Sequence, residues 1–279
     1  MKARIITGLI VGLAALAAII FGGYFFSIFV TAAAAVGVFE FLRALRNSGK
    51  NPAISPSVLI FLTLPAGLFS LVKAPGNLVF TAGGKNFFLA VVFVALILSA
   101  AVFVFDHKNR TLEDSASPLF GTVYIVLFLW CGIALRELPQ GMHLILMTLV
   151  GSVMSDTCAF VVGSLLGKRK LCPDISPKKT FEGMWAGLGG GALSLVIYGL
   201  VLFLLKIDTG VPFWFCPILG ILVSFVSQVG DLFMSAVKRQ CGIKDFGKIL
   251  PGHGGVLDRI DSYLPSFAVT FIVVTVIFG

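Results

Sequence analysis

Long apolar runs recur along the whole sequence and limit its possible folds more than any other feature. The segment 88-FLAVVFVALILSAAVFVF-105, for example, contains no charged residue. A run of this length spans the hydrocarbon core of a bilayer as a helix, which satisfies its own backbone hydrogen bonds. It lacks the alternation of apolar and polar residues that a transmembrane strand requires. Only 12% of the residues are charged, against about a quarter in soluble domains. The sequence therefore predicts an all-α integral membrane protein.

The apolar runs predict a polytopic helical bundle of about nine transmembrane helices. The first run follows a basic start and resembles a secretory signal. A second run comes almost at once, so we interpret the first as an uncleaved span. The predicted spans are 5–21, 24–42, 57–72, 87–105, 118–135, 142–160, 184–205, 211–231 and 262–278.

The basic residues predict the orientation of this bundle. With nine spans, 17 of the 21 Lys and Arg residues fall on one side of the membrane. The positive-inside rule then places the N-terminus in the cytoplasm and the C-terminus outside. We expect a multi-pass protein of the cell inner (cytoplasmic) membrane. The basic residues near 43–50 and 108–110 are interpreted as determinants of topology alone.

The distribution of polar residues predicts two regions. Residues 1–140 are expected to form scaffold helices, which could also carry oligomer contacts. Residues 141–279 are expected to form a catalytic transmembrane region. Its two cytoplasmic loops, 161–183 and 232–261, combine both signs of charge with Gly and Pro.

Aspartates in the C-terminal region are candidate ligands of a hard cation. Asp258 and Asp261 are three residues apart, and a helix would place both on one face in its first turn. Helix capping alone is the alternative interpretation. Carboxylates without a matching His or Cys set suit Mg²⁺, which leaves room for phosphate oxygens, and fit zinc poorly. The candidate metal ligands are Asp231, Asp258 and Asp261, with Asp156 and Asp245 as second choices.

Basic residues and glycines close to these aspartates indicate phosphate binding. The stretch 175-ISPKKTFEG-183 places two lysines just before a span, and 251-PGHGG-255 lets backbone N–H groups approach an anion. A P-loop motif is absent from the sequence. Glu40 is a lone acid in the second span. It is expected to pair with Arg43 or to line the same cavity as these phosphate-binding residues. The candidate substrate-binding residues are Ser176, Lys178, Lys179, Thr180, Lys238, Arg239, Gly254, Gly255 and Arg259.

The stretch 235-SAVKRQCGIKDFGKILPGHGGVLDRID-261 resembles the signature of the phosphatidate cytidylyltransferase (CDP-diacylglycerol synthase) family. The shared form is Ser, two residues, Lys-Arg, four residues, Lys-Asp, then Pro-x-His-Gly-Gly and Asp-Arg-x-Asp. A second block, 155-SDTCAF-160 together with 175-ISPKKTFEG-183, is also similar to that family. The sequence departs from the family pattern at Cys241, at Phe246 and at Gly163-Ser164.

The resemblance implies conversion of CTP and phosphatidic acid to CDP-diacylglycerol and pyrophosphate with Mg²⁺. It leaves open whether a second cation also binds. It implies CTP, phosphatidic acid and the lipid bilayer as partners, with no nucleic acid, and leaves a homodimer open. The catalytic residues it implies are Asp231, Asp258, Asp261, Lys244 and His253.

Two other classes of protein remain as alternatives. One is a kinase that uses CTP to phosphorylate a lipid alcohol, for which a neutral hydroxyl nucleophile would require a base. The other is a secondary transporter of an anion, which would place ionisable groups near the membrane midplane.

Overall fold

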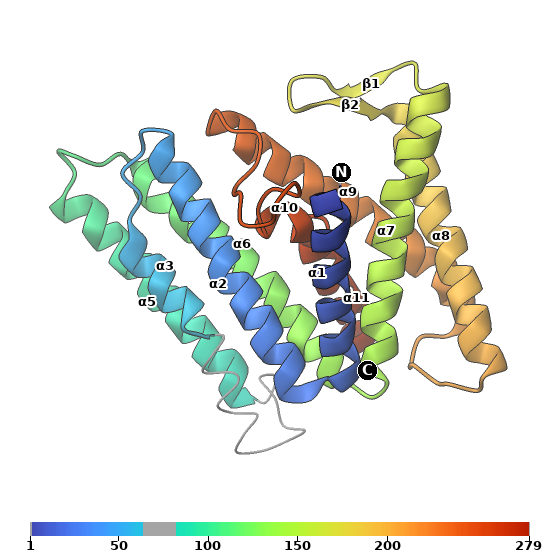
Figure 1. Ribbon diagram of the computed structural model, residues 1–279. Coiled ribbons are helices and arrows are strands. Elements are labelled where there is room, and N and C mark those ends of the chain that lie inside the picture. Colours follow the sequence, from blue (N-terminus) through green and yellow to red (C-terminus); the bar gives the residue numbers. More distant parts are fainter. Residues whose placement is uncertain (1, 64–81, 279) are drawn as a thin grey trace. The chain divides into compact units, whose positions relative to one another are not determined.

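The computed structural model describes residues 2–63 and 82–278, and most of its regular structure is helical (Figure 1). Within the described residues, five helical segments are long and apolar enough to cross a membrane, and three shorter apolar helices accompany them. The five are Gly23–Asn47, Leu112–Glu137, Gly141–Leu166, Phe181–Leu204 and Phe213–Gln240. The expected all-α, multi-pass membrane architecture is thus confirmed in its general form. The elements are α1 (Lys2–Phe21), α2 (Gly23–Asn47), α3 (Ile54–Phe61), α5 (Ala82–Phe105), α6 (Leu112–Glu137), α7 (Gly141–Leu166), β1 (Lys170–Cys172), β2 (Ser176–Thr180), α8 (Phe181–Leu204), the 3₁₀-helix η1 (Phe213–Phe215), α9 (Cys216–Gln240), α10 (Leu257–Ile260), α11 (Tyr263–Ile272) and the π-helix η2 (Val273–Ile277).

Several helices continue beyond their predicted ends, among them α2, which reaches Asn47. α7 extends to Leu166 and α9 to Gln240, so the predicted loops 161–183 and 232–261 begin later than expected. In α9, apolar residues persist after Asp231, and the basic residues of its last turn complement the negative end of the helix dipole. The predicted span 57–72 starts within α3, and its residues 64–72 lie outside the described residues.

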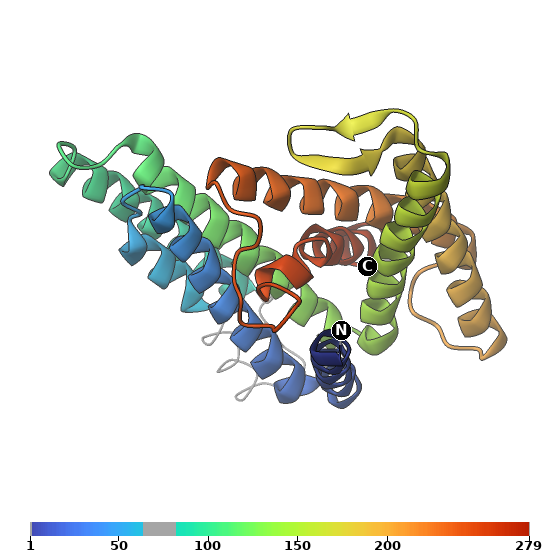
Figure 2. The same cartoon turned by 45° about the horizontal axis from the view of Figure 1, so that its top comes forward.

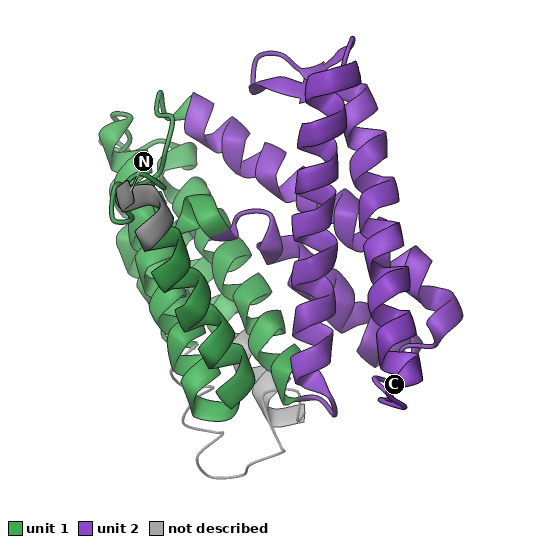
Figure 3. Cartoon of the chain, turned by 45° about the vertical axis from the view of Figure 1, so that its right-hand side comes forward, with its two compact units in different colours: residues 1–137, 240–259 green, residues 138–239, 260–279 purple. Residues whose placement is uncertain are grey.

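The chain divides into two compact units, coloured separately in Figure 3. Unit 1 comprises residues 1–137 and 240–259, and unit 2 comprises residues 138–239 and 260–279. Residues 240–259, here named the signature loop, therefore cluster with the N-terminal helices, although they belong to the predicted C-terminal region. The chain passes from unit 2 into unit 1 and back again around this loop.

Unit 1 is a bundle in which α2 packs against α6, and α3 packs against α5 and α6. Figures 1 and 2 show these helices lying side by side. At the contact between α2 and α6, the ring of Phe41 occupies the space that a side chain at Gly121 would need. Such small residues allow helix backbones to approach closely in membrane proteins.

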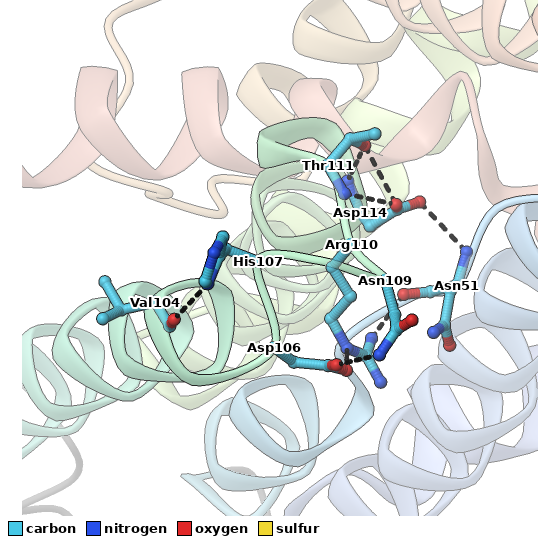
Figure 4. A network of polar contacts seen from close by, with 8 residues as sticks. All are labelled: Asn51, Val104, Asp106, His107, Asn109, Arg110, Thr111 and Asp114. Atoms are coloured by element: carbon cyan, nitrogen blue, oxygen red, sulfur yellow. Dashed lines mark hydrogen bonds and ion pairs between the residues drawn. The ribbon is translucent and has the colours of Figure 1, made fainter.

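Polar contacts join the connections between the helices of unit 1 (Figure 4). Asp114 accepts hydrogen bonds from the backbone N–H of Asn51 (3.0 Å) and from Thr111 N (2.8 Å). Arg110 Nε donates to Asp106 at 2.8 Å. Asn109 also donates to Asp106, and these bonds hold the pKa of this carboxyl below its usual range.

The basic residues near 43–50 and 108–110 thus do more than determine topology. Lys50 forms an ion pair with Glu113 of α6, and Arg110 pairs with Asp106 and donates to the carbonyl of Asn51. These cations join the segment after α2 to the segment between α5 and α6.

Unit 2 is built around the close contact of α7 with α8. Side chains at Gly183, Gly187 or Gly190 of α8 would collide with atoms of α7 or α9. The small residues of 187-GLGGG-191 thus let α8 pack closely against α7 and α9. Figures 1 and 2 show the β1–β2 hairpin extending away from the end of α7 and the start of α8, which it connects. The hairpin is antiparallel, with Lys170 opposite Thr180.

Buried hydroxyl and amide groups hold α7 to the other helices of unit 2. In an apolar surrounding such groups are stable only when they find hydrogen-bond partners. The bonds are Thr148 to Thr270 (2.8 Å), Ser152 to Ser266 (3.1 Å) and Gln228 to Ser155 (3.2 Å). These contacts fix the α7 and α9 segments that continue to Asp156 and Asp231.

Candidate active site

A lysine and two aspartates from three elements of unit 2 form the first part of the site. Lys179 Nζ of β2 lies 2.7 Å from Asp231 Oδ2 of α9. Ser235 Oγ donates to the other carboxylate oxygen of Asp231 at 3.2 Å. Asp156 of α7 lies within electrostatic range of both Asp231 and Lys179. Asp156, Lys179 and Asp231, here named the Asp231 cluster, were all predicted from the sequence, and the fold brings them together.

The alternation of side chains along β2 decides which lysine reaches this cluster. Successive residues of a strand point to opposite faces. Lys178 is exposed, whereas Lys179 is partly buried beside Asp231. Thr180 is buried, and its Oγ1 accepts a hydrogen bond from Gly183 N at 3.1 Å as the N-cap of α8. Contacts of Ser176, Lys178 and Thr180 with phosphate stay predictions.

A second ionic contact lies where the end of α9 meets the residues before α11. Lys238 Nζ is 3.8 Å from Asp261 Oδ2, and the two residues are only 9% and 7% exposed. Asp261 Oδ1 also accepts a hydrogen bond from Ser262 N at 2.8 Å. Arg239 Nε donates to the carbonyl of Ile175 at 3.2 Å, which joins the end of α9 to the hairpin.

The predicted helix shared by Asp258 and Asp261 is interrupted in the structure. Asp258 lies in the first turn of α10, as expected, but α10 ends at Ile260 and α11 begins at Tyr263. Pro265 has no N–H to donate to the carbonyl of Asp261, so a continuous helix through this point would lack one bond. The prediction of one helix across both aspartates is therefore wrong.

The signature loop closes around the carboxylate of Asp258. Asp258 Oδ2 accepts hydrogen bonds from Phe246 N (2.8 Å) and Gly255 N (3.0 Å). Leu250 N donates to the carbonyl of Gly254 at 3.0 Å, and Gly254 has a φ of 87°. A residue with a side chain rarely adopts that conformation, so glycine is required at this turn.

The other predicted residues of the loop are placed differently. Lys244, Asp245 and Arg259 are exposed. The ring of His253 lies so close to α1 that a side-chain carbon at Gly8 would be 3.2 Å from it. Its Nδ1 is buried and has no hydrogen-bond partner among the described residues. A catalytic role for His253 or Lys244 stays a prediction.

Two departures from the family pattern contribute buried contacts in unit 1. Phe246 packs against Phe41 of α2, with ring centroids 6.3 Å apart. Cys241 is 6% exposed, and this burial raises the pKa of its thiol, although interactions with Ser48 and Lys50 act in the opposite direction. Both residues thus help to hold the signature loop in place.

The carboxylate of Glu40 makes contacts that sequence reasoning did not foresee. Its two oxygens accept hydrogen bonds from Val256 N (3.2 Å) and Leu257 N (2.9 Å) of the signature loop. The expected electrostatic interaction with Arg43 also occurs, but the hydrogen bonds go to the loop backbone. The available signal was a lone acid in a long apolar run, which calls for a specific partner.

The predicted metal ligands are distributed over both units. Asp245 and Asp258 belong to unit 1, whereas Asp156, Asp231 and Asp261 belong to unit 2. Among the described residues, no group of three or more His, Cys, Asp or Glu side chains could hold a metal ion. The two carboxylates of the Asp231 cluster nevertheless suit a hard cation, because Asp156 and Asp231 interact electrostatically and both offer oxygen ligands. Metal binding stays a prediction.

Comparisons with known proteins assign the chain to a family. The sequence model described as "Cytidylyltransferase family" matches residues 2–277. A protein of Mycobacterium bovis named phosphatidate cytidylyltransferase is 30% identical, over 99% of this chain and 89% of its own length. Proteins of the same name from Bacillus subtilis and Staphylococcus haemolyticus are each 34% identical over 95% of this chain, and over 94% and 95% of their own lengths respectively. The resemblance found in the sequence is confirmed, and the chain belongs to the cytidylyltransferase family.

Proposed function

We infer that this protein is a phosphatidate cytidylyltransferase, which converts CTP and phosphatidic acid to CDP-diacylglycerol and pyrophosphate. The observation that carries this inference is the length of the match. Relatives with this name align over nearly the whole chain, including the Asp231 cluster and the signature loop. A nucleotidyltransferase acting on a phospholipid also suits a protein with several apolar helices.

The reaction is an in-line displacement at the α-phosphorus of CTP. A phosphate oxygen of phosphatidic acid forms a new bond to this phosphorus, and the bond to the bridging oxygen of the β-phosphate breaks. Pyrophosphate leaves with that electron pair. A phosphate monoester is mostly ionised at neutral pH, with a second pKa of about 6, so no strong base is required. The protein must chiefly hold two anions in line and neutralise their charge.

The cations of unit 2 are suited to that task. Lys179 comes from the hairpin, and Lys238 and Arg239 come from the last turn of α9. Lys179 and Lys238 each have a carboxylate neighbour that holds the ammonium group in place. We assign these three residues to the phosphates of CTP and phosphatidic acid.

The carboxylates supply the ligands for Mg²⁺ in this proposal. Asp156, Asp231 and Asp261 are the candidates in unit 2, and Asp245 and Asp258 are those in the signature loop. Bound Mg²⁺ would polarise the α-phosphate and stabilise the charge of the leaving pyrophosphate. The aspartates themselves would orient that cation and hold the neighbouring lysines in place.

The substrates also suggest where the site lies. Phosphatidic acid arrives from the bilayer and CTP from the cytoplasm, so we propose a site at the cytoplasmic face of the cell membrane. The distribution of basic residues supports this orientation, with the N-terminus in the cytoplasm and nine spans.

A product assay tests the proposed function. Purified protein in lipid vesicles is given phosphatidic acid and CTP labelled in the α-phosphate, with and without Mg²⁺. We expect labelled CDP-diacylglycerol and one equivalent of pyrophosphate only when Mg²⁺ is present. Formation of CDP with transfer of the γ-phosphate to a lipid alcohol would instead identify a kinase. Uptake of an anion into the vesicles without product would identify a transporter.

A further inference from the structure

Glu40 is a buried acid whose hydrogen-bond partners lie far away in the sequence. The residue is only 1% exposed, and it lies within the apolar helix α2. Removing a carboxylate from water is unfavourable unless hydrogen bonds or charges compensate. Here both oxygens accept backbone N–H groups, Val256 N at 3.2 Å and Leu257 N at 2.9 Å. The carboxyl group of Glu40 is thus directed at the signature loop.

The loop is shaped to receive this carboxylate. Side-chain carbons at Gly247 or Gly255 would collide with the carboxylate of Glu40. Two glycines therefore leave the space that Glu40 occupies, one before and one after the turn around Gly254. The neighbouring residue Phe246 packs against Phe41, which follows Glu40 in α2. These contacts fix the loop to one turn of α2.

The backbone that Glu40 holds leads directly to Asp258. Val256 and Leu257 immediately precede this aspartate, and Leu257 is the first residue of α10. Asp258 in turn accepts hydrogen bonds from Phe246 N and Gly255 N. Glu40 and Asp258 therefore hold the same short segment through neighbouring N–H groups. A shift of this backbone would move the Asp258 carboxylate with it.

We propose that Glu40 is a positioning residue of the active site, which fixes the signature loop so that Asp258 is held in its working orientation. This inference rests on the proposed function. Glu40 acts through the loop and not on the substrates. Its loss should therefore lower kcat more than it changes the KM for CTP, because misplacement of a reacting group by about 1 Å can cost a hundredfold in rate.

The variant Glu40→Gln tests the proposal with little change in shape. Its amide keeps one accepting oxygen but turns an NH₂ group toward one of the two loop N–H groups. We expect kcat for CDP-diacylglycerol formation to fall about a hundredfold, with KM for CTP within about threefold of wild type. Amide hydrogen exchange in residues 250–260 should become faster. Glu137→Gln, the same substitution at the end of α6, is the matched control. It should change neither kcat nor the amide hydrogen exchange of residues 250–260.

A second variant approaches the same contact from the loop. Gly247→Ala places a methyl group where the Glu40 carboxylate lies, so it should reproduce the fall in kcat and the faster exchange. Gly12→Ala is its control, because nothing lies within 4 Å of a side-chain carbon at Gly12. Gly247→Ala leaves the carboxyl group of Glu40 intact and disturbs only its contact with the loop.

The combined results decide between the proposals. Slower turnover and faster loop exchange in both Glu40→Gln and Gly247→Ala, with unchanged controls, would support the positioning role. Wild-type kcat in Glu40→Gln, or a fall that Glu137→Gln shares, would overturn it. Unchanged exchange in residues 250–260 would also overturn it. If the wild-type protein makes no CDP-diacylglycerol, the proposed function fails, while the exchange measurements still decide whether Glu40 holds the loop.

Discussion

The ammonium group of Lys179 lies 2.7 Å from a carboxylate oxygen of Asp231, which joins the β1–β2 hairpin to α9. An ion pair between fully exposed side chains contributes about 0–1 kcal/mol to stability, and a partly exposed pair is still screened by water. The side chains of both partners here are about a quarter exposed, at 25% and 30%. The pair is therefore more important for placing a cation beside carboxylates than for holding the fold together.

Replacement of Lys179 by Ala should lower kcat/KM for CTP about a hundredfold, as expected for the loss of one charged group that stabilises a developing anion. The midpoint of thermal unfolding should stay close to that of wild type. Steady-state kinetics of CDP-diacylglycerol formation provide the measurement. Lys170→Ala, an exposed lysine on β1, is the control and should keep wild-type kinetics. Equal effects of the two substitutions would count against a phosphate-binding role for Lys179.

Replacement of Asp258 by Asn should reduce turnover to about a hundredth of wild type or less, because the amide cannot supply negative charge to a cation. The fold should survive, since the side-chain oxygen of Asn can still accept the N–H groups of Phe246 and Gly255. Activity and thermal unfolding are measured on the same preparation. An active Asp258→Asn variant would contradict the assigned role.

Removal of Mg²⁺ with a chelator should abolish product formation, and added Mg²⁺ should restore it. Binding to the folded state alone also stabilises a protein, by about 2.7 kcal/mol when the ligand is at a hundred times its Kd. We therefore expect Mg²⁺ to raise the unfolding temperature of wild-type protein, and to do so much less in Asp231→Asn. An equal rise in both proteins would place the cation elsewhere.

Cys241 should react slowly with alkylating reagents near neutral pH. Burial raises the pKa of its thiol, so the folded protein contains less of the reactive thiolate than the unfolded protein. In a variant that retains only this cysteine, the alkylation rate should rise with pH in both the folded and the denatured protein. The rise should occur at a higher pH in the folded protein. Because the unfolded state ionises first as pH rises, this group should also reduce stability at alkaline pH. A rate equal to that of denatured protein would contradict the burial of Cys241.

Close packing of α8 predicts different effects for neighbouring glycines. Gly187→Ala should destabilise the protein by about 1–3 kcal/mol, because the methyl group would collide with Gln228 and with the backbone of Ser155. Gly189→Ala should be neutral, since nothing lies within 4 Å of a side-chain carbon there. Thermal unfolding of the two variants in one detergent tests this difference.

The helical architecture was predictable because bilayer thickness fixes both the length and the apolar character of a span. The close packing at Gly187 was predictable for a related reason, since small residues in a span serve helix contacts. The ends of α7 and α9 were less predictable from the sequence. An apolar sequence can continue as helix beyond the membrane, and hydropathy alone does not mark where the bilayer ends.

The candidate site was predictable at the level of residue types, because carboxylates and cations close to a membrane segment need partners. The Asp231 cluster combines three such residues from separate stretches of sequence. The interruption of the helix between Asp258 and Asp261 could not be foreseen from their spacing. It depends on Pro265, which cannot donate a backbone hydrogen bond to the carbonyl of Asp261. The partners of Glu40 were also hidden, since backbone N–H groups carry no sequence signal.

The hydrogen bonds between Glu40 and the signature loop have a consequence for biosynthesis. Val256 and Leu257 follow Glu40 by 216 and 217 residues. At about 5–20 residues per second, a ribosome adds that stretch in roughly ten to forty seconds. During this interval α2 has already been made, while its acid still lacks its eventual donors. The nascent helix must therefore keep that group hydrated or otherwise shielded, and unit 1 reaches its final form only near the end of translation.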